Sequence, residues 1–162
     1  MKIAKKRRRE GKTDYLKRKS LLKSGKPRVV IRKTNRYLIA QYIISKEAKD
    51  QVKIGLKSKD LLKYNWPKEN LGGLKSISAA YFLGFLMGKR IIKEKLEQPI
   101  ADFGMIRIIH KNKLFAFLKG LIDAGLKINC EKKSFPSEER IKGEHLKNKI
   151  NFKEIKSKLD TV

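Results

Sequence analysis

The sequence predicts a single layered α/β domain, in which a mostly antiparallel mixed sheet packs with helices. Three observations predict this class. Strand-like segments come first and helical segments dominate later, hydrophobic residues make up 40% of the chain, and a length of 162 residues suits one domain. We place a basic N-terminal arm at residues 1–11, the domain at 12–146 and a Lys-rich C-terminal tail at 147–162.

The first part of the chain is basic and has few residues to pack. Residues 1–9 form a basic run, which we expect to be disordered without a partner. A helix then begins at Lys12 or Thr13, with Asp14 in its first turn, and ends at Gly25.

A strand-rich stretch follows. Residues 28–34 and 37–44 are rich in β-branched and aromatic side chains, and Asn35-Arg36 between them fits a tight turn. Apolar and polar residues alternate over 52–56, which is typical of a strand with one buried face. Together these segments predict an antiparallel three-stranded meander.

The middle of the chain predicts a buried helix. Residues 59–64 fit a short helix, and 70–75 fit a loop. Ser76 or Ser78 can cap a helix that runs to about Lys95. Because this helix is apolar almost all round, we expect the sheet and other elements to cover it on every side.

The last third mixes short elements. Residues 100–103 fit a short buried strand, and apolar residues over 114–122 keep helical spacing. Ile128 is a candidate start for a last short strand, and Ser137 for the N-cap of a helix. Residues 152–159 fit one or two amphipathic helical turns.

The charge points to a polyanionic partner. The chain has 42 Lys and Arg against 16 Asp and Glu, a formal net charge of +26, and each neutralised phosphate adds affinity by releasing a counterion. A membrane-surface protein would concentrate this charge beside an amphipathic segment, whereas here it is spread over the chain. The longest apolar run, near residues 77–88, is too short to span a membrane. We therefore expect nucleic acid and no membrane as partner.

The compartment is indicated by two features. Cys130 is the only cysteine, which excludes an intramolecular disulfide and fits a reducing cytoplasm. The basic N-terminus is not followed by the apolar core of a signal peptide. We expect a cytoplasmic protein.

The sharpest signal for RNA contact lies in the N-terminal third, where cations far outnumber acids. Arginine suits phosphate because its planar fork donates two hydrogen bonds. Arg28, Arg32 and Thr34 have the same parity on a strand and should share a face. A solvated charged surface is the plainer alternative. The predicted contacts are Lys5, Lys6, Arg7, Arg8, Arg9, Lys12, Tyr15, Arg18, Lys26, Arg28, Arg32, Lys33, Thr34, Asn35 and Arg36.

Aromatic residues lie among these cations and can stack on unpaired bases. For Tyr15 and Tyr37 a stacking role and a packing role are equally open, while a core position is favoured for Tyr42.

Catalytic and metal sites are not predicted. Cys130, His110 and His145 lack the spacing of a zinc site, and no nucleophile lies in a triad signature. A metal-dependent nuclease would need several converging carboxylates, but Asp102 and Asp123 are the only candidates in the apolar half, and a cap or a salt bridge is favoured for each. We expect no enzyme activity, no small-molecule substrate and no cofactor, with Mg²⁺ bound only through RNA.

Two long blocks of sequence carry a family resemblance. They are Arg7-Arg-Arg-Glu-Gly-Lys-Thr-Asp-Tyr15 and Phe135-Pro-Ser-Glu-Glu-Arg-Ile-Lys-Gly-Glu-His145. Shorter matches keep the same order at residues 21–28, 32–36, 79–84, 102–104, 115–116 and 120–126. These blocks resemble the 5S-rRNA-binding proteins of the large ribosomal subunit, called L eighteen in bacterial naming and L five in eukaryotic naming. The later block resembles the archaeal and eukaryotic branch, and the length is similar to an archaeal-type member.

The resemblance implies a three-layer α/β domain that binds 5S rRNA and helps anchor it in the central protuberance. Implied partners are 23S rRNA and neighbouring large-subunit proteins, including the other 5S-binding protein. The implied contacts coincide with most of those predicted from charge. The chain departs from the family at residues 70–76 and 110–113, so contacts in those loops are not carried over. A general nucleic-acid chaperone or architectural protein is the alternative.

Overall fold

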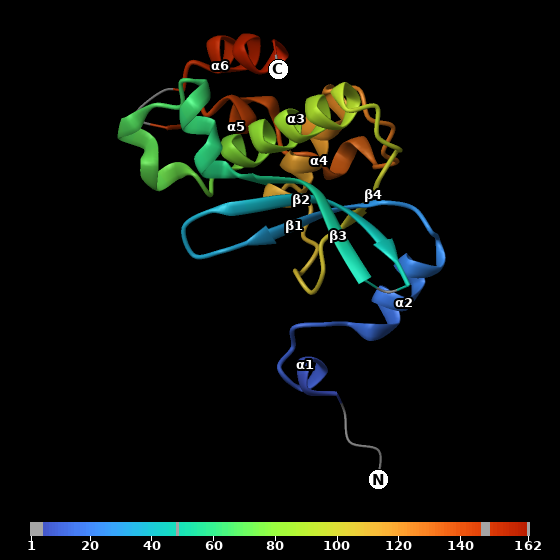
Figure 1. The fold of residues 1–162 in the computed structure, drawn as a ribbon. Helices are drawn as coiled ribbons and strands as arrows, with labels where there is room; N and C mark the ends of the chain where they lie inside the picture. Colours follow the sequence, from blue (N-terminus) through green and yellow to red (C-terminus); the bar gives the residue numbers. More distant parts are fainter. Residues whose placement is uncertain (1–4, 48, 147–149, 162) are drawn as a thin grey trace.

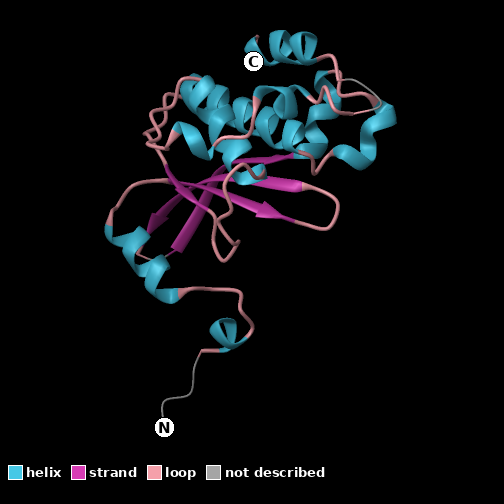
Figure 2. Ribbon diagram, turned by 180° about the vertical axis from the view of Figure 1, so that it is seen from behind, coloured by secondary structure: helices cyan, strands magenta, loops and turns pink. Residues whose placement is uncertain are grey.

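A four-stranded mixed sheet runs through the middle of the molecule, with helices on both of its faces (Figure 1). The computed structural model describes residues 5–47, 49–146 and 150–161. Four helices lie on one side of the sheet: α3 (Ile77–Lys93), α4 (Lys113–Asp123), α5 (Glu138–Lys142) and α6 (Phe152–Asp160). Helix α2 (Tyr15–Lys23) lies on the other side, and the short α1 (Lys6–Arg9) extends beyond it. The reverse view shows the same arrangement (Figure 2).

The predicted meander is confirmed and gains a fourth strand. Strands β1 (Arg28–Lys33), β2 (Leu38–Lys46) and β3 (Lys49–Lys57) are antiparallel, and β4 (Ile100–Asp102) pairs in parallel with β1 in the order β3-β2-β1-β4. The β4 pairing makes the sheet mixed, as the fold class requires.

The turn between β1 and β2 is closed by one threonine. Both the backbone N–H and the hydroxyl of Thr34 donate to the Tyr37 carbonyl, at 2.9 and 2.8 Å, and the Tyr37 N–H donates to the Thr34 hydroxyl oxygen at 2.9 Å. This leaves Asn35 and Arg36 at the exposed tip, where the sequence placed them.

The two faces of β1 have different surroundings because side chains alternate along a strand. Val29 and Ile31 belong to the main hydrophobic core with the helices. Arg28 and Arg32 point to the opposite face, where both reach Asp102 at the end of β4. The parity argument for these two arginines is confirmed, and it places them on the same side as α2.

Helix α3 is the centre of the core. Ser76 caps it by accepting a hydrogen bond from the Ala79 N–H at 3.1 Å. As expected, other elements cover it all round: the sheet and α4, α5 and α6, together with the 3-10 helix η1 (Ser58–Tyr64). Phe82 lies edge-on to Trp66, with ring centroids 6.3 Å apart, and packs on Phe152 of α6 at 4.8 Å.

Several boundaries differ from those predicted. Helix α2 begins at Tyr15, because Asp14 is its N-cap and accepts from the backbone N–H groups of residues 16 and 17. Residues 68–73 form a second 3-10 helix, η2, where a loop was predicted. The strand predicted at Ile128 is wrong: its side chain packs against the core, while the neighbouring Lys127 N–H bonds to the Gln98 side chain at 3.2 Å.

The two ends of the chain also contain structure. Residues 6–9, which we expected to be disordered, form the single turn α1. Helix α6 packs on α3 through Ile155 and Leu159, which are fully buried. The part of the predicted tail that carries α6 is therefore continuous with the core; residues 147–149 and 162 lie outside the described residues.

Helices α3 and α4 meet at two glycines. A Cβ atom at Gly84 would overlap the Phe117 carbonyl oxygen, and one at Gly120 would overlap the Tyr81 carbonyl oxygen. The backbones are thus in direct contact, which only glycine permits. The crossing of these helices depends on both residues.

We expect Gly84→Ala to destabilise the fold by about 3 kcal/mol, because the added methyl group must push two backbones apart. Urea unfolding of the whole chain measures this loss. Gly72→Ala is the matched control, since nothing lies within 4 Å of a Cβ at that position, and it should be nearly neutral. Equal stability of Gly84→Ala and the control would contradict the close crossing.

Candidate nucleic-acid interface

Arg28 is buried and tied to two carboxylates. Only 3% of it is exposed, and its guanidinium donates to Asp102 at 3.1 Å, to Asp50 at 2.8 Å and to the Ser45 hydroxyl at 2.9 Å. Because these bonds occupy its side chain inside the protein, Arg28 does not face a partner. The prediction that it contacts RNA is therefore corrected: Arg28 holds the interface together from within.

Asp102 and Asp123, the two carboxylates weighed for a nuclease, have partners in the protein. Asp102 accepts the Gly104 N–H at 2.8 Å as well as Arg28, and Asp123 accepts the Tyr81 hydroxyl at 2.9 Å. Within residues 5–47, 49–146 and 150–161, no three His, Cys, Asp or Glu side chains gather as metal ligands would. The cap or salt-bridge role is confirmed for Asp102.

Asp50 joins α2 to the sheet. Its carboxylate accepts from Arg18 of α2 at 3.0 Å and from Ser45 at 2.7 Å, in addition to Arg28. Partial burial alone would raise the pKa of the Asp50 carboxyl, but the hydrogen bonds from Arg18 and Ser45 and the charge of Arg28 outweigh burial and lower it. Asp50 is therefore ionised over the whole neutral range.

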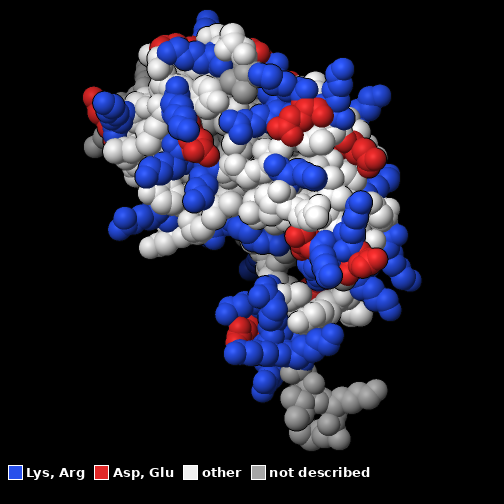
Figure 3. Space-filling view, viewed as in Figure 1, with Lys and Arg blue, Asp and Glu red and all other residues white. Residues whose placement is uncertain are grey.

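Most of the predicted contacts gather beside this network. We call this group the arm surface; it consists of Lys5, Lys6, Arg7, Arg8, Arg9, Lys12, Lys17, Arg18 and Arg32. Residues 5–9 and Lys12 are exposed, and Arg32 keeps 45% of its side chain exposed. In Figure 3, blue side chains crowd the lobe that α1 forms below the sheet.

A small pocket lies between the arm, α2 and the sheet. It has a volume of about 130 Å³, and six cationic side chains line it together with Asp14 and Asp102. Both carboxylates are engaged, Asp14 as the cap of α2 and Asp102 with Arg28. The unbalanced positive charge makes this pocket suitable for the oxygen atoms of a phosphate.

Lys17 is a member of the arm surface that sequence reasoning missed. Its ammonium donates to the Gly104 carbonyl at 3.3 Å, which links α2 to the loop after β4. The only signal in the sequence was its place in the basic helix. Tyr15 is half-buried, and the Lys5 ammonium lies 4.7 Å from the centre of its ring, so one face of this ring is covered by a cation.

The remaining predicted contacts lie at the other end of β1. Lys33 follows Arg32 directly on this strand, but successive side chains point to opposite faces of a sheet, and Lys33 lines a groove with core residues of the helical side. Lys33, Asn35 and Arg36 are exposed at the tip of the hairpin. Thr34 is half-buried and closes the turn. The predicted site is therefore two surfaces rather than one continuous patch. Lys26 is exposed between α2 and β1.

The fold adds three cations to this end. The ammonium of Lys75 donates to the Asn35 carbonyl at 2.7 Å, and Arg107 and Lys113 line a groove with Lys33. We call the group Lys33, Asn35, Arg36, Lys75, Arg107 and Lys113 the hairpin surface. Sequence reasoning missed Arg107 and Lys113 because only the β1–β4 pairing brings the β4–α4 loop beside the hairpin, and it missed Lys75 because 40 residues separate it from Asn35.

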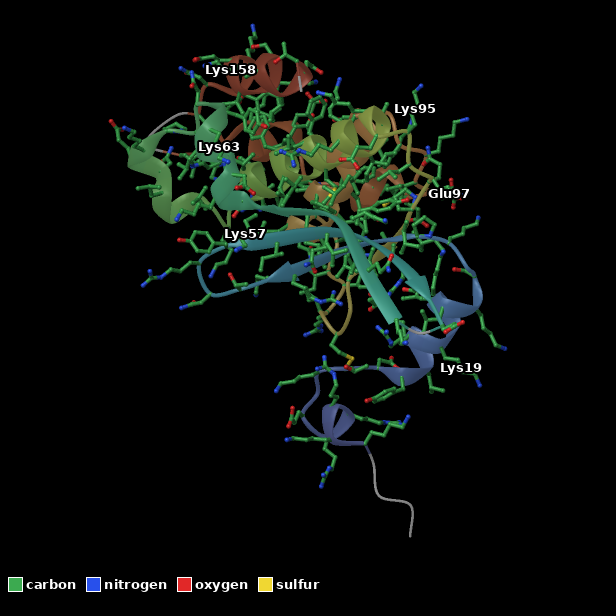
Figure 4. All side chains as sticks on the ribbon, viewed as in Figure 1. Lys19, Lys57, Lys63, Lys95, Glu97 and Lys158 are labelled. Atoms are coloured by element: carbon green, nitrogen blue, oxygen red, sulfur yellow. The ribbon has the colours of Figure 1, made fainter. Side chains whose placement is uncertain are left out.

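Positive charges crowd together in the hairpin surface. The pKa of the Lys113 ammonium is lowered, first by its partial burial and then by the charges of Lys75 and Lys33. A bound anion would relieve this repulsion. Cations elsewhere point outward from every layer, as the labelled Lys19, Lys63, Lys95 and Lys158 show (Figure 4).

Comparison with known proteins identifies the family. The family model described as "Ribosomal large subunit proteins 60S L5, and 50S L18" matches residues 1–101. The protein from Korarchaeum cryptofilum named "Large ribosomal subunit protein uL18" is 46% identical over 90% of this chain and 72% of its own length. This chain belongs to that family.

Two further relatives carry the same printed name. The uL18 protein of Methanothermobacter thermautotrophicus is 43% identical over 90% of this chain and 73% of its own length. That of Caldivirga maquilingensis is 41% identical over 90% of this chain and 69% of its own length. All three are archaeal, which agrees with the archaeal-type resemblance of the sequence. The L5/L18 family is a family of structural ribosomal proteins and not of enzymes.

The other residues weighed in the sequence have local roles in this family member. Tyr42 is fully buried, and its hydroxyl donates to the Glu97 carbonyl at 3.0 Å, so its predicted core position is confirmed. Tyr37 packs partly against the core. His110 stacks on Phe115 with centroids 5.6 Å apart and is hydrogen-bonded to Ser134. None of the described helices is long and apolar enough to cross a membrane.

We expect the stability of the fold to depend on pH through the Asp50 carboxylate. A carboxyl whose pKa is lowered by folding stabilises the fold above its unfolded pKa of about 3.9, and this stability is lost as the pH falls through the lower folded pKa. We therefore expect Asp50→Asn to cost about 1–2 kcal/mol at pH 7 and progressively less below about pH 4. Urea unfolding across this pH range gives both values.

Glu69→Gln, at an exposed carboxyl, is the control and should change stability little at either pH. If Asp50→Asn lowers the free energy of unfolding by the same amount at pH 7 and below about pH 4, the charge of Asp50 does not hold α2 to the sheet.

Proposed function

We propose that this protein is a structural constituent of the large ribosomal subunit that binds 5S rRNA and helps anchor it in the central protuberance. Family membership supports the ribosomal assignment. The arm surface is the observation that carries the RNA contact, because its cations surround a pocket of phosphate size on an otherwise folded platform.

The two surfaces have different parts in this proposal. The arm surface grips phosphates, which supplies affinity and depends strongly on salt. The hairpin surface carries Asn35, whose side-chain amide makes no hydrogen bond to any described residue, so it is available to the sugar or base edges of an RNA loop. Folded RNA suits this arrangement better than duplex DNA, because the fold presents no helix positioned as a groove reader.

The proposal also includes the partners of this protein in the ribosome. The expected partners are 5S rRNA, 23S rRNA and neighbouring large-subunit proteins, including the other 5S-binding protein, in the cytoplasm. We expect no cofactor of its own and Mg²⁺ only where RNA holds it. No small-molecule substrate is expected.

Competition distinguishes this role from that of a general nucleic-acid chaperone. Labelled 5S rRNA is bound to the whole chain, and unlabelled 5S rRNA or a scrambled RNA of equal length is added. We expect only 5S rRNA to compete at stoichiometric concentrations. Equal competition by both RNAs would reject the specific assignment.

Removal of residues 1–9 should flatten the salt dependence of binding more than it changes RNA preference. This segment contains six cations, and their loss should reduce the slope of log K against log salt by about 5. Titrations at several salt concentrations measure the slope. A variant with glutamine at exposed lysines 53, 59, 63, 68, 95 and 153 is the control, because it loses the same number of charges. An equal change of slope in both variants would show that the arm does not contact phosphates.

Arg32→Ala combined with Asn35→Ala tests recognition by the sheet and hairpin. We expect the ratio of affinities for 5S rRNA and its scrambled competitor to fall by about fivefold, because the lost base or sugar contact of Asn35 costs about 1 kcal/mol, whereas loss of the Arg32 phosphate contact weakens binding of both RNAs. Lys53→Ala with Lys59→Ala, at exposed positions, is the matched control. If binding to both RNAs weakens by the same factor, these residues contribute general attraction alone.

A further inference from the structure

The block from Phe135 to His145 is specific in sequence, yet neither cationic surface includes it. In the structure, part of this block forms one wall of an open groove of about 880 Å³. The opposite wall is the C-terminal half of α4, and residues 128–133 complete the lining. The groove lies on the helical side of the sheet, whereas the arm surface lies on the other side (Figures 1 and 2).

The rim of the groove is strongly positive. Its cations are Lys111, Lys119, Lys132, Lys133 and Arg140, and its carboxylates are Asp123 and Glu138. Both carboxylates are engaged inside the protein. Asp123 accepts the Tyr81 hydroxyl and lies 4.0 Å from Lys119, and Glu138 lies 3.6 Å from Lys142.

The other rim cations are unpaired. Among residues 5–47, 49–146 and 150–161, no carboxylate lies within ion-pair distance of Lys111, Lys132, Lys133 or Arg140. Four unneutralised charges around one groove favour an occupant that carries several negative charges close together.

The floor of the groove is apolar and contains an aromatic ring. Phe135 is half-buried, lies beside Ile122, Ile128 and Pro136, and has the Lys119 ammonium 5.8 Å from its ring centre. A cationic rim over an aromatic floor is the arrangement that binds unpaired nucleic acid, with phosphates at the rim and a base stacked on the ring. A regular duplex keeps its bases stacked inside and could use only the rim.

We propose that this groove is a second RNA-binding site, which takes a short unpaired RNA segment and stacks one base on Phe135. The proposal rests on the proposed function in that the occupant is RNA, but it concerns a separate surface. Because the groove and the arm surface face opposite sides of the sheet, one protein can hold two RNA segments at once, and the second binding event gains from the first.

The test uses the whole chain and a seven-nucleotide oligouridine that carries 4-thiouridine, with folded 5S rRNA measured in parallel. Lys132→Glu with Arg140→Glu reverses two rim charges, and Phe135→Leu removes the ring but keeps an apolar side chain. Lys59→Glu with Lys68→Glu is the control, since it changes the net charge equally at exposed positions away from the groove.

We expect photocrosslinks between the oligonucleotide and residues 128–140 in the unaltered protein. The double reversal should lower oligonucleotide affinity at least tenfold relative to the control, and Phe135→Leu about fivefold or more, while 5S rRNA still binds through the arm surface. Crosslinks confined to the arm, or equal affinities of the groove and control variants, would overturn the second site and leave the proposed function standing.

Two other outcomes distinguish the groove proposal from the proposed function and from protein docking. Failure of unaltered protein to bind 5S rRNA, with groove crosslinks intact, would reject the proposed function and leave the groove as an RNA site. If an oligoglutamate peptide displaces the oligonucleotide from the groove at lower concentration than unlabelled oligouridine does, the groove is a protein-docking surface and the second RNA site is overturned.

Discussion

The buried guanidinium of Arg28 is the constraint on which the lower half of the structure depends. A charged group with 3% exposure cannot be hydrated, so it must find carboxylates within the protein. Asp102 comes from the end of β4 and Asp50 from the start of β3. Such a pair adds little net stability over an apolar one, and because Arg28 has two carboxylate partners, the loss of one still leaves its charge paired with the other. The network therefore determines which segments pack together, and it adds little to the free energy of unfolding.

That arrangement reaches from the sheet to the arm. Asp50 also binds Arg18, which brings α2 under the sheet, and Lys17 of the same helix bonds to the Gly104 carbonyl. Asp102 meanwhile accepts from Gly104 and shapes the start of the loop that ends in α4. Two carboxylates thus position three arginines from two segments of the chain, α2 and β1. The pocket beside these carboxylates is lined by more cations than carboxylates, so it keeps a net positive charge that a polyanion can neutralise.

The upper half provides rigidity by a different means. The α3 and α4 backbones touch at Gly84 and Gly120. The ring of Phe82 on α3 also packs against Trp66, in the segment between η1 and η2, and against Phe152 of α6. A platform of this density does not deform easily, so the arm surface, the hairpin surface and the α4–α5 groove keep their mutual orientation. In the proposed function, a fixed spacing between these cationic surfaces allows one small protein to join separate segments of folded RNA.

The sequence alone determined the local elements and the overall character of the protein. The Asn35-Arg36 turn and the Ser76 cap were predicted correctly, because turn chemistry and capping are decided by neighbouring residues. The alternation over residues 52–56 holds for Ile54 and Leu56, which are buried, whereas Val52 is 49% exposed. The β2–β3 ladder shifts its register beside Val52, which the sequence did not show. The family was also evident from blocks of sequence, and the net charge of +26 predicted a polyanionic partner. The Ile128 strand was predicted wrongly, because one β-branched residue does not show whether a free strand edge lies beside it.

Only the tertiary structure decided which cations are available. Arg28 and Arg32 share a strand face and a residue type, yet one is buried among carboxylates and the other is 45% exposed. Likewise, Lys113 joins the hairpin because β4 pairs with β1 across a long stretch of chain, and Lys75 joins it through its bond to the Asn35 carbonyl. The sequence determines the charge of each side chain. Its hydration and its neighbours depend on contacts between residues far apart in the chain, and those contacts exist only once the chain has folded.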